Sequence, residues 1–112
     1  MHKFDPTTAT RVEPAGHFGH LEVADVVPKA VGGIFSTQLS YCPPGGGGEK
    51  HHHETEAQVF LVIRGELTFD TGEERFTLRE NEAVMFEPME PHATLNESDS
   101  ESVSVVITVS RP

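Results

Sequence analysis

Two histidines separated by a single residue are the strongest candidates for metal chemistry in this chain. His51 and His53 belong to the run His51-His52-His53. In an extended strand, residues two apart point to the same side, so His51 and His53 would project together while His52 points away. Neutral imidazoles are common ligands of transition metals. The pair therefore predicts half of a metal site.

Gln58 and His92 are the other two candidate ligands. Gln58 begins an apolar run and shares its strand face with Phe60 and Val62, so its amide needs a partner in the interior. An unpaired buried amide costs roughly 1 to 3 kcal/mol, and a metal would serve as the partner. His92 follows the segment Pro88 to Pro91, whose two prolines constrain the entry into the next strand. The sequence thus predicts a divalent transition metal held by His51, His53, Gln58 and His92.

The spacing of these residues resembles the motifs of the cupin superfamily, in particular its small single-domain members with one conserved barrel. The first family motif is G(X)5HXH(X)3,4E(X)6G. Here the motif positions are filled by Gly45, His51, His53, Gln58 and Gly65, with Gln in place of Glu. The match carries the resemblance because both the histidine pair and the two glycines fall at the expected intervals.

The second family motif, G(X)5PXG(X)2H(X)3N, is matched more loosely. Pro88, His92 and Asn96 correspond to its proline, histidine and asparagine. Asn81 and Glu82 stand where Gly-Asp is usual, and the interval from Pro88 to His92 is one residue short. The resemblance extends from Gly45 to Asn96 and covers about half of the chain.

The resemblance implies a double-stranded β-helix with a metal inside the barrel, open to one or two substrate or water positions, and often homodimeric assembly. Gln58 brings no negative charge where the family has Glu, so a bound dication would keep its full charge and favour an anionic ligand. Three imidazoles and one amide oxygen suit Fe, Ni, Cu, Zn, Co or Mn.

Two classes of function fit these features. The first is a metal-dependent enzyme acting on a small organic anion. The resemblance slightly favours dioxygenase-type chemistry, and the alternative is redox-neutral isomerase, lyase or decarboxylase chemistry, which needs a general base that the sequence does not identify. The second class is a non-catalytic module that binds a metal or a small molecule. The sequence assigns no catalytic residue in either case.

The elements that must position the ligands are short strands rich in Val, Ile, Phe and Thr, separated by Gly, Pro, Asn and Asp, which indicates an all-β fold. We expect strands near residues 21–27, 33–42, 57–64, 66–71, 74–78, 83–87, 92–95 and 102–109. Residues 70–73 should close a hairpin, and the glycine run 45–48 is expected to be a loop. Gln38 and Tyr41 are candidates for polar contacts at the pocket mouth.

Length and charge limit the possible partners. The 112 residues fit one domain, 1–112, in which residues 1–20 form an irregular arm or an added edge strand. His17 and His20 in this arm are expected to have surface or packing roles. A formal charge of −10 argues against nucleic acid and anionic membranes as partners. The sequence contains neither a membrane-spanning apolar stretch nor a signal peptide, which makes the cytoplasm the expected location.

Overall fold

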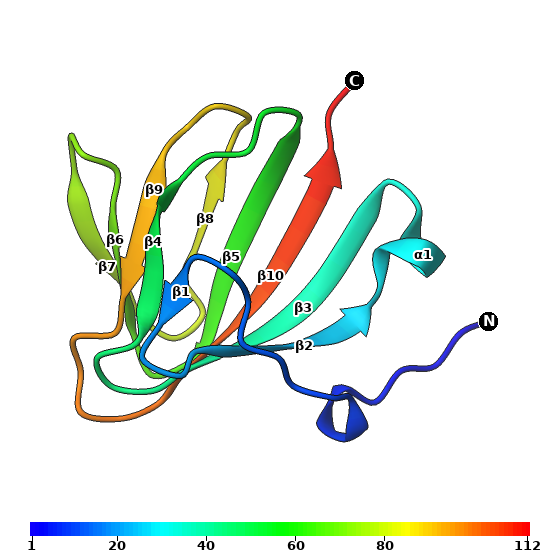
Figure 1. Cartoon of the computed structure of the whole chain (residues 1–112), viewed down its shortest axis with the longest axis horizontal. Coiled ribbons are helices and arrows are strands. Elements are labelled where there is room, and N and C mark those ends of the chain that lie inside the picture. Colours follow the sequence, from blue (N-terminus) through cyan, green and yellow to red (C-terminus); the bar gives the residue numbers. More distant parts are fainter.

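Two five-stranded antiparallel sheets make up the computed structural model, which describes residues 1–112 (Figure 1). Sheet A contains, in spatial order, β2 (Glu22–Val27), β3 (Phe35–Cys42), β10 (Ser102–Ser110), β5 (Glu56–Arg64) and β8 (Ala83–Phe86). Sheet B contains β1 (His17–Phe18), β4 (Gly47–His51), β9 (His92–Leu95), β6 (Leu67–Asp70) and β7 (Arg75–Leu78). This arrangement is the double-stranded β-helix that the motifs imply.

The hydrophobic core lies between the two sheets. Phe60 and Val62 of β5 and Val106 of β10 face Phe69 of β6 within one buried cluster. The rings of Phe60 and Phe69 meet edge to face, with centroids 5.2 Å apart. Because side chains alternate along a strand, this packing determines which residues of each strand point into the barrel and which point out.

The eight strands expected from the sequence are all present, with ends within two residues of the expected ones. The hairpin at residues 70–73 is also confirmed. Asp70 pairs with Arg75 across it, and the Thr71 amide donates a hydrogen bond to the Glu74 carbonyl oxygen at 2.9 Å. Gly72 adopts a φ of 91°, a conformation that glycine tolerates at no steric cost.

The expectation that residues 45–48 form a loop is wrong for the second half of this segment. Gly47 and Gly48 are the first residues of β4 and pair with Leu95 and Thr94 of β9. Glycine lowers strand propensity, so the sequence pattern concealed this strand. A Cβ atom on Gly47 would overlap the carbonyl oxygen of Thr94, which shows that the close pairing requires glycine here.

The first twenty residues combine irregular chain with an added edge strand. A 3-10 turn, η1 (Pro6–Thr8), precedes an isolated bridge between Val12 and Val23, and β1 then pairs with β4 at the edge of sheet B. The only α-helix, α1 (Lys29–Gly32), is four residues long. No helix of this structure has the length and apolar character needed to cross a membrane.

Candidate metal centre

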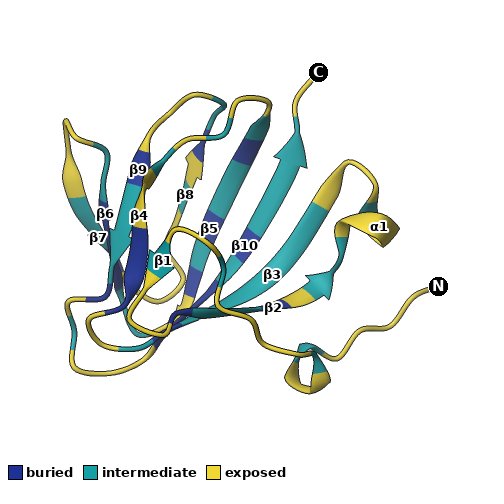
Figure 2. Cartoon of the chain, viewed as in Figure 1, coloured by how far each residue is buried: buried dark blue, intermediate teal, exposed yellow.

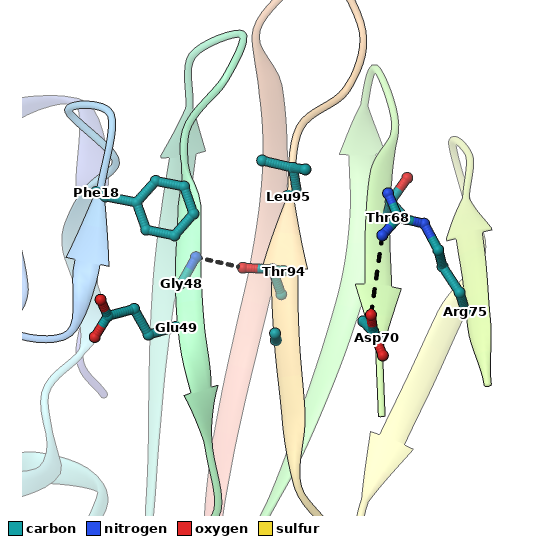
Figure 3. A pocket seen from close by; sticks show the side chains of 9 residues that line it. Phe18, Gly48, Glu49, Thr68, Asp70, Arg75, Thr94 and Leu95 are labelled. Atoms are coloured by element: carbon teal, nitrogen blue, oxygen red, sulfur yellow. Dashed lines mark hydrogen bonds and ion pairs between the residues drawn. The ribbon is translucent and has the colours of Figure 1, made fainter. Parts of the chain in front are cut away.

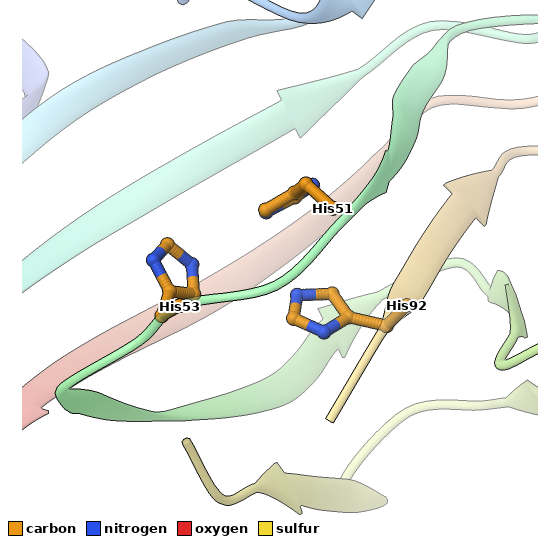
Figure 4. A group of neighbouring side chains, drawn as sticks. All are labelled: His51, His53 and His92. Atoms are coloured by element: carbon orange, nitrogen blue, oxygen red, sulfur yellow. The ribbon is translucent and has the colours of Figure 1, made fainter. Parts of the chain in front are cut away.

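Three of the predicted ligands meet inside the barrel. His51 ends β4 and is the register partner of His92 at the start of β9, and His53 follows two residues after His51. One ligand nitrogen from each of the three rings lies within 4.8 Å of the other two. The three side chains surround a common space (Figure 4). His52 is exposed, as the strand alternation predicts.

Backbone carbonyl groups determine which nitrogen of two rings carries the proton. The Nδ1 of His51 lies 2.8 Å from the Glu49 carbonyl oxygen, and the Nδ1 of His92 lies 3.2 Å from that of Glu90. A carbonyl oxygen only accepts, so each Nδ1 must be the protonated donor. Each Nε2 then keeps a free lone pair, as a metal ligand requires.

Several acceptor atoms at this place are buried and have no hydrogen-bond partner. These atoms are His53 Nε2, His92 Nε2 and Gln58 Oε1. The Nε2 of Gln58 donates to Thr108 Oγ1 at 3.2 Å, which leaves the amide oxygen without a partner. Buried polar atoms are rarely left unpaired in folded proteins. The donor set of imidazole nitrogens and an amide oxygen therefore fits a divalent metal ion.

A cavity of about 160 Å³ opens onto this site. His51, His53 and Gln58 line it together with Gln38 and Ser40 of β3. No carboxylate is among the lining residues. The neighbouring Glu56 is held by Lys29, whose Nζ lies 2.9 Å from Glu56 Oε2. The walls of the cavity thus offer neutral ligands and neutral hydrogen-bonding groups, while the Glu56 carboxylate lies outside the lining with its Oε1 4.0 Å from His53 Nδ1.

The Cupin_2 family model, described as a cupin domain, matches residues 39–109. The chain belongs to the cupin family. The match includes every predicted metal ligand and six of the ten strands in full, from β4 to β9. No curated protein sequence matches this cupin.

Solved structures resemble this cupin over nearly its whole length. A predicted oxalate decarboxylase from Thermotoga maritima has a TM-score of 0.88 at 18% identity, covering 97% of this chain and 99% of the other. KdgF from Halomonas sp. has a TM-score of 0.80 at 15% identity, covering 99% of this chain and 96% of the other. The polyketide cyclase RemF from Streptomyces resistomycificus has a TM-score of 0.83 at 18% identity, covering 97% of this chain and 79% of the other. These likenesses establish the shared fold.

His17 is the site residue that the sequence did not identify. It lines the same cavity as His51, and the two ring centroids lie 6.1 Å apart. The expected surface or packing role is therefore corrected for His17. It is accurate for His20, which is exposed and lies 3.0 Å from a carboxylate oxygen of Glu13. No motif spacing could reveal His17, because the pairing of β1 with β4 alone brings it to the cavity.

Burial, together with the smaller effect of positive charge on His51 and His53, lowers the pKa of His92 to about 4. His92 is only 1% exposed and stacks on Phe86, with ring centroids 4.2 Å apart. In the metal-free protein this imidazole is therefore neutral at physiological pH, the form that binds a metal. The site needs no proton release from His92 before an ion can enter.

The two polar candidates on β3 lie on opposite sides of sheet A. Gln38 lines the cavity as expected, and its Nε2 donates to Asp25 Oδ1 at 3.0 Å, which leaves its amide oxygen free to accept. Tyr41 does not line the cavity, and its ring is covered by the Arg11 guanidinium at 3.6 Å. The strand alternation explains this difference, since the two residues are three apart.

A second hollow, of about 250 Å³, lies on sheet B away from the histidines (Figure 3). Ala93 and Leu95, which alternate with His92 along β9, are part of its wall. Its one cationic side chain, Arg75, is already paired, at 2.6 Å with Glu97 and at 3.9 Å with Asp70. Its carboxylates, Glu49 and Asp70, are not part of a group of three ligands, whereas the histidines are, which leaves the histidine cavity as the candidate site.

Proposed function

We propose that this cupin is a metal-dependent enzyme that binds a small organic anion and catalyses redox-neutral proton-transfer chemistry of the isomerase, lyase or decarboxylase class. The observation that carries the proposal is the ring of unpartnered acceptor atoms around a cavity without a carboxylate. A dication bound there would supply Lewis-acid polarisation of ligand oxygens. Its uncompensated charge favours an anion as the ligand.

The size and lining of the cavity support a small ligand. Its volume of about 160 Å³ is below the roughly 300 to 1,000 Å³ of pockets for drug-sized ligands, which suits a smaller molecule. Ser40 and the free amide oxygen of Gln38 would hydrogen-bond the polar groups of the ligand. Phe60 and Val106 form the apolar part of the wall and would exclude water from the reacting atoms.

His17 supports the redox-neutral branch over the dioxygenase-type chemistry that the family resemblance slightly favours. Its Nδ1 donates to the Ala15 carbonyl oxygen at 2.9 Å, so its Nε2 carries a free lone pair. This nitrogen is a proton acceptor beside the ligand cavity, which is the general base that the redox-neutral branch needs.

The proposal is tested by the metal content of the protein purified without a His-tag or added metal. Elemental mass spectrometry should find about one equivalent of a divalent transition metal, and small carboxylates should bind the loaded protein but not the chelated one. His17→Asn should keep metal and carboxylate binding while turnover is lost. Failure to take up any metal on titration would refute the proposal, and consumption of dioxygen with a bound anion would select the dioxygenase branch.

A further inference from the structure

The amide of Gln38 has a fixed orientation at the wall of the metal cavity. Its Nε2 lies 3.0 Å from Asp25 Oδ1, and the side chain makes no second hydrogen bond. An ionised carboxylate only accepts hydrogen bonds, so the amide must turn its N–H side to Asp25. The Gln38 oxygen then remains as an acceptor without a partner. Asp25 thus decides which polar atom of Gln38 a ligand meets.

The pairing of β2 with β3 positions Asp25 for this role. Asp25 is the register partner of Gln38, and Val23 is the register partner of Ser40. Val23, Gln38 and Ser40 line the cavity, whereas Asp25 does not. It is the one exposed residue of β2, at the edge of sheet A (Figure 2). Asp25 therefore acts on Gln38 from outside the cavity, as a positioning residue.

The polar atoms at the cavity wall are mostly acceptors. His17 Nδ1 donates to the Ala15 carbonyl oxygen, which leaves Nε2 as an acceptor. Gln58 turns its N–H side to Thr108, and its amide oxygen is unpaired. Ser40 contributes one hydroxyl, which donates or accepts, and no Lys or Arg lines the cavity. The wall is therefore best matched by a ligand that brings a hydrogen-bond donor of its own.

We propose that the ligand is a small carboxylate that also bears a hydroxyl group, and that Asp25 sets this preference by orienting Gln38. The inference rests on the proposed function, because the carboxylate end needs the bound metal. The hydroxyl end donates its hydrogen to Gln38 Oε1. Its oxygen is still able to accept a hydrogen bond from Ser40, so both polar groups of β3 gain a partner.

Two other classes of small anion match the wall less well. A dicarboxylate would set the lone pairs of its second carboxylate against those of Gln38 Oε1 and His17 Nε2, since neither atom donates. An unsubstituted carboxylate such as propionate would cover Gln38 Oε1 without giving it a partner. An acceptor that loses water without a new hydrogen bond weakens the complex. A hydroxyl group avoids both penalties.

The test compares ligands that differ in the hydroxyl group, on the full chain loaded with Zn²⁺, an ion without redox chemistry. Isothermal titration gives the dissociation constants of lactate, 3-hydroxypropionate and propionate. The preference ratio is the constant for propionate divided by that of the tighter-binding hydroxy acid. All three ligands carry one negative charge, so the ratio cancels the attraction between cation and carboxylate. Because hydroxyl groups also coordinate metal ions, the ratio is compared between variants.

Two variants remove the oriented acceptor in different ways. Gln38→Met keeps the approximate size of the side chain without its polar atoms. Asp25→Lys replaces an acceptor with a group that only donates, so it should draw the Gln38 oxygen away from the ligand. Each should lower the preference ratio roughly five- to tenfold, the value of one ordinary hydrogen bond. Because Asp25 is exposed, Asp25→Lys should fold normally.

Two further variants serve as controls. Asp99→Lys makes the same change of charge at another exposed residue, in the loop 96–101, and should keep the wild-type ratio. Asp25→Glu retains a carboxylate that accepts from Gln38, and it should also keep a ratio close to that of the wild type. Circular dichroism and Zn²⁺ content should be the same in all variants, since neither Asp25 nor Gln38 is a metal ligand.

The outcomes separate this inference from the proposed function. Failure of all three ligands to bind the loaded protein would refute the proposed function and this inference with it. If the ligands bind with the same ratio in the wild type and in Gln38→Met, the proposed function stands and the inference is overturned. A ratio that falls in Gln38→Met but not in Asp25→Lys would overturn the role given to Asp25.

Discussion

At the scale of single residues, proton placement on the imidazoles prepares the site for a cation. His51, His92 and His17 each bond through Nδ1 to the carbonyl oxygen two residues earlier in the chain. The same local geometry therefore orients three rings and leaves each Nε2 free. His53 differs, because its Nδ1 lies 4.0 Å from Glu56 Oε1 instead of on a carbonyl group.

Removal of His92 should abolish metal binding. We expect His92→Ala to raise the dissociation constant for the metal at least a hundredfold, because the variant loses the most buried of the three imidazoles. Titration followed by equilibrium dialysis measures the affinity, and far-ultraviolet circular dichroism should still show a β-rich fold. His52→Ala is the matched control and should bind normally. If His92→Ala fails to fold, His51→Ala tests the same point at a half-buried residue.

The neutral amide of Gln58 should set the preference for anions. Gln58→Glu adds one negative charge beside the bound cation, so small carboxylates should bind roughly tenfold more weakly while the metal binds at least as tightly. Isothermal titration of the metal-loaded proteins measures both affinities. Equal or tighter carboxylate binding by Gln58→Glu would mean that Gln58 is not close to the cation.

At the scale of elements, the pairing of β4 with β9 holds the site together. β4 supplies His51 and β9 supplies His92, and Gly48 N donates to Thr94 Oγ1 at 2.9 Å between them. Asn96 anchors the end of β9 to β3, because its Nδ2 donates to the Cys42 carbonyl oxygen at 2.8 Å. The glycines of β4 thus serve the metal centre indirectly, by allowing β9 to approach.

Replacing Gly47 should disturb this strand pair and the site with it. The Cβ of Gly47→Ala would overlap the Thr94 carbonyl oxygen, so the strands must separate. We expect the free energy of unfolding to fall by at least about 2 kcal/mol and the metal affinity to fall as well. Urea unfolding and metal titration measure the two effects. In the control Gly32→Ala, the new Cβ meets only the Phe35 side chain at 3.3 Å, and both quantities should stay near their wild-type values.

At the scale of the whole molecule, the two sides of sheet A differ in composition. The inner side presents Gln38, Gln58 and the core residues to the cavity, while the outward residues of β5 and β10 are largely apolar. Ligand binding therefore involves only the inner side of these strands.

Two buried groups should set the pH range in which the metal-free fold is stable. His92 has a folded pKa of about 4 against 6.5 when unfolded, so the unfolded chain binds the extra proton between these values. The contribution of His92 to the free energy of unfolding is therefore fully present well above pH 6.5. It decreases as the pH falls and is about 2 kcal/mol smaller at pH 5. Burial raises the pKa of Cys42 from 9.0 to about 11, so stability is lost again as the pH rises through that range.

Urea unfolding with a chelator at pH 5, 7 and 10 measures this profile. The free energy of unfolding should be highest at pH 7. In His92→Ala the fall between pH 7 and pH 5 should shrink by about the same 2 kcal/mol, because the group that takes up the proton on unfolding is gone. If the free energy of unfolding of His92→Ala fell between pH 7 and pH 5 by as much as that of the wild type, His92 would not be the group responsible for the fall.

The sequence by itself determined the barrel and three of the residues that meet at its centre. Short runs rich in Val, Ile, Phe and Thr predicted eight strands, and the interval between His51 and His53 predicted that their side chains share one space. These features are local, because the period of a strand relates neighbouring residues directly. His92 followed from motif spacing, and the structure places it on the strand that pairs with β4. Gln58 lies on the cavity wall, as a buried polar group in a strand should.

Tertiary structure alone decided the rest. It made the glycines of β4 a strand, because close approach of β9 outweighs the low strand propensity of glycine. It brought His17 to the cavity through the pairing of β1 with β4, and it left the alternate residues of β5 and β10 at an open surface. Each of these outcomes depends on which strands become neighbours, and that follows from how two sheets close around one core, which no local period or spacing specifies.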